Sequence, residues 1–559
     1  MKTRVRDLCQ QSDKLFSKRG HVQNMWQAIA EQLYPERADF TGTLRDALDS
    51  GDDLQTGAPS MARRDLADSL SSMLRPKDKV WFRARSQNDK INEDPTALQF
   101  FDWMSEQMRT AMYDKRAQFV RATKQGDNDF ACFGQTAIEV SPNNDLTGLL
   151  FRNWHLRDVA WCENSELAID TVYRKWKPEV RQLIRQFPRT VSGKIKQKEK
   201  DTPYAEIDCL HIVIPADSYD LKEQPGKLVR KQPYVSIYVD KENETILEEK
   251  YVSRLRYVIP RWATVAGSQY AHSPGATIAY RDARLLQQIT LTLLEAGEKV
   301  VDPPSVGIAE AIAGGVNLYA GGHTWVDAEY GEQAENAVRY LQIDPRGLSF
   351  GKDREALILN TIEKALYLDR IGIPYPDKNM TATEYRGQVE EYVRRALPLF
   401  EPMEVEYNGG LCEETFDLLL GMGGFGSPAD WPETVQGADL KWSFESPLQQ
   451  ATERGKSQAF VETSNLLKAA MELDPGAINE INLPKAFRDA VPGTGAPSDW
   501  MRSREEADQG RAAQAQQEAV QAQAQAAAQA AGLAGAAGEA AQSMAGGMAA
   551  QAATEQAVA

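Results

Sequence analysis

The chain has few cysteines and few histidines for its length. Its five cysteines are odd in number and widely separated: Cys9, Cys132, Cys162, Cys209 and Cys412. This pattern excludes a disulfide framework and a CxxC metal site, and it is typical of free thiols in a reducing cytoplasm. The five histidines are equally scattered, without ligand spacing: His21, His155, His211, His272 and His323. We therefore expect no metal ion and no cofactor.

Long apolar runs are also absent. None approaches the roughly 20 residues that a membrane-spanning helix needs. The first residues, MKTRVRDLCQQ, are too charged for a signal peptide. A hydrophobic content of 42% and a charged content of 26% are ordinary for a soluble globular protein. Because 559 residues exceed one hydrophobic core, we expect several subdomains and no membrane partner.

Catalytic motifs are missing as well. The sequence contains no HExxH or GxSxG, and no GxGxxG stands between a strand and a helix. A GKS triplet ends at Ser457, but the glycine that a phosphate loop needs is Gln450, and the flanks favour helix. Adjacent carboxylates such as Glu413 and Glu414 diverge on a helix. We expect a protein that is not an enzyme, although distant residues could still converge in space.

The charge balance is acidic. The chain has 64 basic and 80 acidic residues, which gives a formal net charge of −16. An acidic surface repels the DNA backbone, which argues against a repressor or a nuclease. It is compatible with a channel through which DNA slides without sticking. Taken alone, the charge favours the simpler interpretation that it aids solubility.

The first half of the chain changes from helical to strand-rich patterns. Apolar stripes at helical spacing predict core helices; they are Leu66, Leu70, Met73 and Leu74, then Phe100, Phe101, Met104, Met108 and Met112. Residues 130–260 contain short β-branched and aromatic runs such as HIVIP and YVSIYVD, which predict strands. The lysine run SGKIKQKEKD (192–201) could touch phosphates, but it is more typical of a solvated hairpin tip.

Two helices with a compact insert follow. Residues 281–301 form a heptad-like seam: Leu286, Ile289, Leu293, Ala296 and Val300. This seam would pack either between neighbouring subunits or inside its own subunit. Residues 305–350 are Gly-rich with short strands, and helix returns at 352–370 with Ile358, Ile362, Ala365 and Leu366 on one face.

A Gly/Pro/Asp-rich loop and a new helix come next. The helix begins near Thr381 or Thr383, either of which can cap it, and Glu384 has the capping-box spacing from Thr381. The last segment, 511–559, has 23 alanines and no aromatic residue. Its first half has high helix propensity, whereas glycines from Gly532 onward favour disorder.

Six short blocks, in this order, resemble the portal (head-to-tail connector) proteins of short-tailed bacteriophages. They are DSLSSMLRPKDKVWF (68–82), FACFGQTAIEV (130–140), YAHSP (270–274), the long helix with PP (303–304), MTATE (380–384) and SPL (446–448). The third block matches the family's Tyr-Gly-Arg-Ser-Pro only at Tyr270, Ser273 and Pro274. The blocks span about residues 60–470, and the two ends of the chain carry little of the resemblance.

The resemblance implies an α+β, predominantly helical portal fold that assembles into a cyclic ring of twelve subunits. Its parts would be a wing at 1–280 (β-rich at 130–260), a stem helix at 281–302, a clip at 303–350, a second stem helix at 351–370, a channel loop at 371–380, a long helix returning to the wing at 381–445, a crown at 446–510, and a tail at 511–559 that is a helical barrel or disordered.

The resemblance also implies a function without catalysis. Double-stranded DNA would pass through the ring at one capsid vertex of a virion assembled in the host cytoplasm. Terminase, capsid or scaffold proteins and tail adaptors would dock on the ring. Lys378 and Asn379 are the candidate phosphate donors; the channel-loop residues are Gly372, Pro374, Tyr375, Pro376, Asp377, Lys378 and Asn379. The alternatives are another virion component, such as a capsid or tail protein, and a DNA-packaging enzyme subunit, which should show a Walker motif or a carboxylate cluster.

Overall fold

The computed structural model describes most of the chain. The long described stretches are 2–43, 51–77, 80–143, 145–220, 232–307, 346–371, 403–444, 447–473 and 481–494. Shorter ones are 312–313, 325–326, 338–340, 388, 391, 395, 476, 507, 509–517, 519–525 and 544. Two compact units are formed, one by Met1–Ile91 with Gln99–Thr452, the other by Asn92–Leu98 with Glu453–Ala559.

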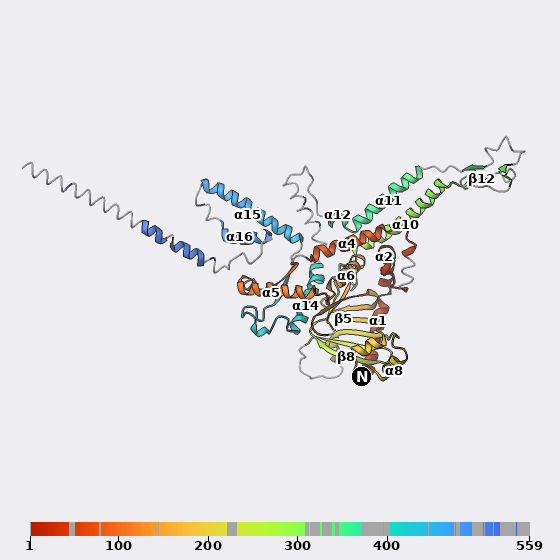
Figure 1. Cartoon of the computed structure of the whole chain (residues 1–559), viewed down its shortest axis with the longest axis horizontal. Helices are drawn as coiled ribbons and strands as arrows, with labels where there is room; N and C mark the ends of the chain where they lie inside the picture. Colours follow the sequence, from red (N-terminus) through yellow and green to blue (C-terminus); the bar gives the residue numbers. More distant parts are fainter. Residues whose placement is uncertain are drawn as a thin grey trace, which may run out of the picture. The chain divides into compact units, whose positions relative to one another are not determined.

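Helices dominate, and sheets are confined to a few regions, as the predicted α+β class requires (Figure 1). The helices are α1 (Lys2–Lys18), α2 (Gly20–Leu33), α4 (Ala58–Leu74), α5 (Pro95–Met112), α6 (Phe119–Phe133), α7 (Val180–Gln186), α8 (Gly193–Asp201), α9 (Ala216–Asp220), α10 (Pro274–Val301), α11 (Arg346–Ala365), α12 (Leu368–Ile371), α14 (Gly410–Gly421), α15 (Pro447–Leu473) and α16 (Leu483–Ala490). The main strands are β1 (Phe82–Ser86), β2 (Ala137–Pro142), β3 (Leu149–Trp154), β4 (Val159–Glu163), β5 (Ile169–Trp176), β6 (Cys209–Pro215), β7 (Tyr234–Asp240), β8 (Thr245–Val252), β9 (Tyr257–Val258) and β16 (Leu440–Phe444).

A five-stranded antiparallel sheet, ordered β4-β5-β6-β7-β8, forms the β-rich part. Alternate residues point to opposite faces. One face packs Leu210, Ile212 and Ile237 against the apolar side of α1. At one end of the other face, Cys209 and Leu247 pack against α7 and α8. The strands predicted within 130–260 are therefore confirmed.

The prediction for residues 192–201 is wrong. This segment is helix α8 and not a hairpin tip. Its first turn is stabilised by Ser192, whose side chain accepts a hydrogen bond from the Ile195 amide. Ile195 itself is fully buried against the sheet. One capping residue and one apolar anchor were enough to make a helix of a segment that is otherwise polar.

A buried polar network joins this sheet to the smaller sheet β3-β2-β9. Arg174 donates to the Tyr257 hydroxyl at 2.8 Å, and that hydroxyl lies 2.5 Å from Nδ1 of His211. Trp154 donates to Glu139 at 2.7 Å. Burial, reinforced by the charge of Arg174, lowers the pKa of His211 well below its ordinary value. His211 is thus a neutral core histidine with hydrogen-bond partners, as expected from its isolated position in the sequence.

The helical core of the first unit gathers α2, α4 and α6 around Trp26, which is fully buried. The predicted stripe on α4 is confirmed, since Leu66, Leu70 and Leu74 are buried and Met73 packs against the same core. On α5, the predicted stripe is buried at Phe101 and at three methionines: Met104, Met108 and Met112. These residues form core helices because their apolar side chains recur every three or four positions.

Strand β16 returns the chain to its N-terminal part. It pairs antiparallel with β1, so that Phe82 lies opposite Phe444 and Ala84 opposite Trp442. The rings of Phe82 and Trp442 meet edge to face, with their centroids 6.0 Å apart. Two segments separated by more than three hundred residues therefore share one two-stranded ladder.

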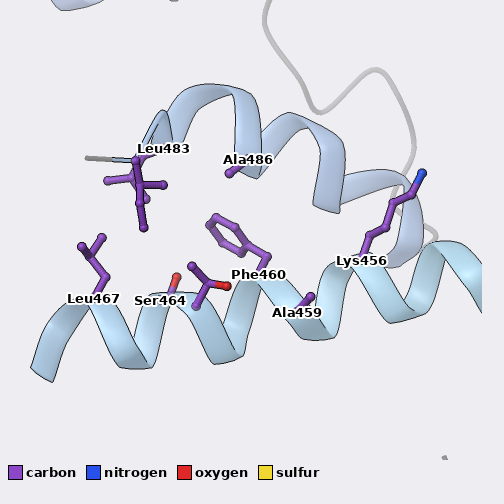
Figure 2. A pocket seen from close by; sticks show the side chains of 9 residues that line it. Lys456, Ala459, Phe460, Ser464, Leu467, Leu483 and Ala486 are labelled. Atoms are coloured by element: carbon purple, nitrogen blue, oxygen red, sulfur yellow. The ribbon is translucent and has the colours of Figure 1, made fainter. Parts of the chain in front are cut away.

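In the second unit, α15 and α16 enclose a small pocket (Figure 2). Phe460 points from α15 toward α16, and its ring meets that of Phe487 at a centroid distance of 5.9 Å. The pocket volume of about 170 Å³ is below the size of a ligand site, roughly 300 Å³ or more. Lys456 and Ser457 lie on α15, so the GKS triplet is helical as predicted and is not a phosphate loop.

Candidate functional site: the stem hairpin and its anchorage

Helix α10 begins earlier than predicted, at Pro274 and not near 281. Ser273 caps it by accepting a hydrogen bond from the Ala276 amide at 3.2 Å. The same hydroxyl donates to the Ala131 carbonyl at 2.8 Å, which fixes the start of α10 to the end of α6. Proline suits the first helical position because its missing N–H would be unpaired there anyway. The helix thus spans 28 residues, about 42 Å at 1.5 Å per residue.

Helices α10 and α11 run antiparallel and side by side (Figure 1). They approach closely at both ends of the shared length because a glycine stands at each. A Cβ at Gly275 would lie 2.5 Å from the Ala365 carbonyl oxygen, and one at Gly351 would overlap the Leu293 side chain. We call this pair the stem hairpin.

The structure divides the predicted seam of α10 into an inner and an outer part. Leu286 is buried in the main core and Ile289 packs against it, while Leu293 lies over Gly351 of α11. Ala296 is half-buried and Val300 is exposed. The first three residues therefore face the same chain. Packing of the seam between neighbouring subunits stays a prediction.

The outer surfaces of the stem hairpin carry many apolar side chains. The prediction that one face of α11 is buried is confirmed, since Ile358, Ile362 and Leu366 lie in the core. Large apolar residues are nevertheless exposed on both helices: Ile278, Leu285, Leu291, Leu294, Val300, Val301, Phe350 and Leu357. Exposed apolar side chains that gather on one element of a protein often mark an interaction site. This hairpin therefore has the composition of a surface that another protein covers.

Between the two helices the chain forms small antiparallel ladders. Strand β12 (Ser305–Gly307) pairs with β15 (Val338–Tyr340), and β13 (Ile312–Ala313) pairs with β14 (Trp325–Val326). The ladder of β12 and β15 brings the two ends of the insert together. Trp325 is 75% exposed, an unusual state for the residue type that most often anchors protein interfaces.

Both ends of the segment that contains the predicted channel loop reach one core. Leu366 and Met403 belong to the same buried cluster. On the first side, Tyr367 interrupts the helix with a φ of 61°, which separates α11 from α12. On the other side, the chain enters a π-helix, η5 (Met403–Gly409), a rare form that is common at functional sites. The predicted loop residues themselves lie outside the described residues: Gly372, Pro374, Tyr375, Pro376, Asp377, Lys378 and Asn379.

A buried ionic cluster holds η5 in place. Arg75, at the end of α4, donates to the Asn408 side chain at 2.8 Å and to the carboxylate of Asp127 on α6. Asn408 in turn donates to the Leu74 carbonyl at 3.3 Å, and the guanidinium lies 4.5 Å from the Tyr407 ring centre. Sequence patterns gave no sign of this cluster because its members come from three distant segments.

A second ionic cluster ties α14 to the strand region. Arg256 donates to Asp417 at 2.8 Å and to Glu414 at 3.5 Å. Glu413 points outward to Arg254, at 2.6 Å. The adjacent carboxylates Glu413 and Glu414 therefore diverge, as predicted. Burial raises the pKa of Glu414 to about 7, against the opposing effect of Arg256 and Arg254.

Stability should therefore depend on the protonation of Glu414. Its pKa in the folded chain lies above the ordinary value, so the folded state binds the proton more tightly than the unfolded state. The stabilisation is complete below about pH 4.5 and is lost as the pH rises through about 7. The loss should be on the order of 3 kcal/mol. Arg256 keeps Asp417 as a partner throughout.

The matched variant is Glu414→Gln, which cannot titrate. Urea unfolding of both proteins at several pH values checks the prediction. We expect the variant to gain stability relative to the parent chain as the pH rises from 5 to about 8. Parallel pH profiles would show that Glu414 is already ionised in the folded chain.

Neither a membrane span nor a metal centre is found in the part of the chain that the structure describes. Helices there are too short or too polar to cross a bilayer. Within the same residues, His, Cys, Asp and Glu side chains do not gather in groups of three that could hold a metal ion.

Comparison with known proteins gives the family. Residues 6–501 match the family described as "Bacteriophage head to tail connecting protein". A relative described as "Probable portal protein", from Bordetella phage BPP-1, is 24% identical over 445 residues, which cover 78% of each chain.

Solved structures add a weak likeness. A chain in the virion of a native gene transfer agent particle is 9% identical, with a TM-score of 0.32 over 73% of this chain and 89% of that one. A chain in the neck of an empty gene transfer agent particle is 11% identical, also with a TM-score of 0.32, over 73% and 90%. These scores are too low to assign a fold, so the family is assigned from the sequence match alone. The chain belongs to the family of bacteriophage head to tail connecting proteins.

Proposed function

We propose that this chain is the portal protein of a phage capsid, as its relative in Bordetella phage BPP-1 is described to be. It would form a closed ring at the vertex where head and tail join, and DNA would enter and leave through that ring. Membership of the head to tail connecting family supports the location. The observation that supports assembly into a ring is the exposed apolar surface of the stem hairpin. Head-to-tail packing of identical subunits buries such a surface on every copy, and it gives a closed ring when the rotation between neighbours closes.

The parts of the chain then take the roles that the resemblance implied. The stem hairpin would line the ring, and the insert between its helices, with both ladders, would form the clip that was predicted at 303–350. Residues 1–280 would form the wing, to which the chain would return through the long helix at 381–445 and β16. Residues 446–510, which contain α15 and α16, would form the crown. The same resemblance implies a phage of the short-tailed type. Trp325, exposed at the clip, is the residue that we expect a terminase or tail adaptor to contact.

The function needs no covalent chemistry from this chain. A ring of this kind supplies a hole, a docking surface and a valve, while a separate ATPase supplies the energy. The loop at 371–380 would project into the hole, and Lys378 and Asn379 would touch phosphates transiently. An overall charge of −16 would let DNA slide without strong binding to the walls.

Charges placed on the stem hairpin should stop ring assembly. We expect the parent chain to form rings of about twelve subunits with a central hole. In the variant Leu294→Glu with Val301→Glu, neighbouring subunits would have to bury two carboxylates without partners. Such burial costs several kcal/mol, so this variant should remain monomeric. Electron microscopy of end-on views and mass measurement in solution check both results.

The control places the same charges elsewhere. Val120 and Leu146 are exposed outside the stem hairpin, and their replacement by glutamate adds the same two charges. The control variant should still form rings. If the parent chain formed closed shells or open tubes, the proposed ring assembly would be refuted, and another virion component would be favoured. Rings from the stem variant would place the subunit interface elsewhere.

A further inference from the structure

The helices α7 and α8 concentrate positive charge on an acidic protein. Residues 177–201, which contain both helices, hold eight lysines and arginines against three acidic residues, a local charge of +5 in a chain of −16. All eight basic side chains are exposed: Lys177, Arg181, Arg185, Arg189, Lys194, Lys196, Lys198 and Lys200. Figure 1 shows α8 beside the β-rich part. We call these eight residues the basic patch.

Local packing explains why the charges are exposed. The apolar residues of the same segment point inward and are buried against the five-stranded sheet: Val180, Leu183, Phe187, Val191 and Ile195. Lysine or arginine fills much of the remaining surface. The sheet therefore fixes the backbone of both helices, and the basic side chains extend from a rigid support.

Among the described residues, most of the basic patch lacks a neutralising partner. Three of its members form ion pairs, namely Lys177 with Asp208 at 3.2 Å, Arg181 with Glu179 at 2.6 Å and Lys198 with Glu242 at 2.9 Å. The other five have no ion pair among the residues that the structure describes: Arg185, Arg189, Lys194, Lys196 and Lys200. Like charges this close repel one another, which destabilises the fold slightly unless an anion binds.

The chemistry of the patch favours nucleic acid over protein. Protein interfaces need an apolar core and are poor in lysine, whereas the apolar side chains of α7 and α8 are buried. Protein–DNA interfaces are polar and strongly positive. A single-strand site needs several aromatic rings on which bases stack. Tyr204 is one such ring on this part of the surface: it is 67% exposed, and Arg181 lies 4.7 Å from its ring centre. One ring does not make a single-strand site, so the patch favours a duplex.

We propose that the basic patch binds the phosphate backbone of double-stranded DNA without sequence specificity. It is a second DNA contact, separate from the predicted channel loop, and it lies within one chain. It therefore stands whether or not the chain forms a ring. Each lysine or arginine that neutralises a phosphate releases counterions, so the binding weakens steeply as salt is added.

The test measures binding of a labelled DNA duplex of about 30 base pairs to the full chain across a range of salt concentrations, by fluorescence anisotropy. The patch variant replaces the five unpaired residues by glutamine: Arg185, Arg189, Lys194, Lys196 and Lys200. The dissociation constant should rise at least about tenfold at low salt. The slope of log K against log salt should become shallower by about four to five, since each phosphate contact contributes about 0.9.

The control separates the patch from overall charge. Arg6, Lys14, Lys18, Arg64 and Arg121 are exposed on α1, α4 and α6, and their replacement by glutamine removes the same charge. This variant should keep most of the binding and the salt slope. A third variant, with Lys194, Lys196 and Lys200 replaced by arginine, keeps the charge and should bind DNA as the parent does.

Two results would overturn the proposal. One is an equal loss in the patch and control variants, which would mean that only net charge matters. The other is unchanged binding in the patch variant, which would mean that DNA binds elsewhere and that the partner of the patch is an acidic protein. Circular dichroism of each variant checks folding. Ring formation is measured separately, so a chain that binds DNA through the patch but forms no rings would contradict only the proposed function.

Discussion

Replacement of Gly134 by alanine should destabilise the first unit by more than about 3 kcal/mol. Gly134 ends α6 with a φ of +72°, a conformation that residues with a side chain rarely adopt. A Cβ at this position would also overlap the backbone of His272 and Ser273. Because Ser273 caps α10, the overlap would push the stem hairpin away from α6. A backbone neighbour, unlike a flexible side chain, has little room to move.

Gly426 provides the control. Its φ is also +72°, but a Cβ there would meet no atom within 4 Å. Gly426→Ala therefore measures the backbone strain alone, about 1 kcal/mol. Urea unfolding of both variants gives the difference, which is the cost of the overlap at Gly134. Equal losses would mean that the backbone of His272 and Ser273 shifts easily, and the rigid junction between α6 and α10 would be refuted.

Local periodicity allowed much of the fold to be predicted. The stripe on α4 and the buried face of α11 recur every three or four residues, and this spacing both predicts a helix and identifies its core side. Two strands of the five-stranded sheet, β6 and β7, were predicted from the short β-branched runs HIVIP and YVSIYVD. Boundaries were less accurate. The start of α10 was placed about seven residues late, although Pro274 is a favourable first helical residue.

Other features left no local pattern. Residues 192–201 lack apolar alternation, yet Ser192 and Ile195 were enough to make α8. Contacts between distant segments were not predictable from spacing, as with Asn408, which is more than three hundred residues from Arg75. The same applies to the raised pKa of Glu414, which depends on burial. The predicted channel-loop residues stay a prediction, because they lie outside the described residues.

Removal of the Asp127 carboxylate should be nearly as severe as the change at Gly134. In Asp127→Ala, the buried guanidinium of Arg75 loses its only acidic partner in the cluster described above and keeps Asn408. Loss of one partner of a buried ion pair costs about 3–5 kcal/mol, because a charge remains in an apolar environment. Replacement of both partners, by Arg75→Met with Asp127→Leu, should recover much of the loss.

The surface pair between the same two helices is the control. Lys124 of α6 and Asp68 of α4 lie 3.4 Å apart with both side chains about half exposed. Asp68→Ala should therefore cost less than about 1 kcal/mol. Urea unfolding compares the three variants, and hydrogen exchange locates the change. Because Arg75 holds Asn408, amides of η5 should exchange faster in Asp127→Ala but not in Asp68→Ala. Unchanged exchange in η5 would show that the π-helix keeps its place without the ionic cluster, and the anchorage of the segment that follows the predicted channel loop would have to be sought in the packing of Met403 and Tyr407 instead.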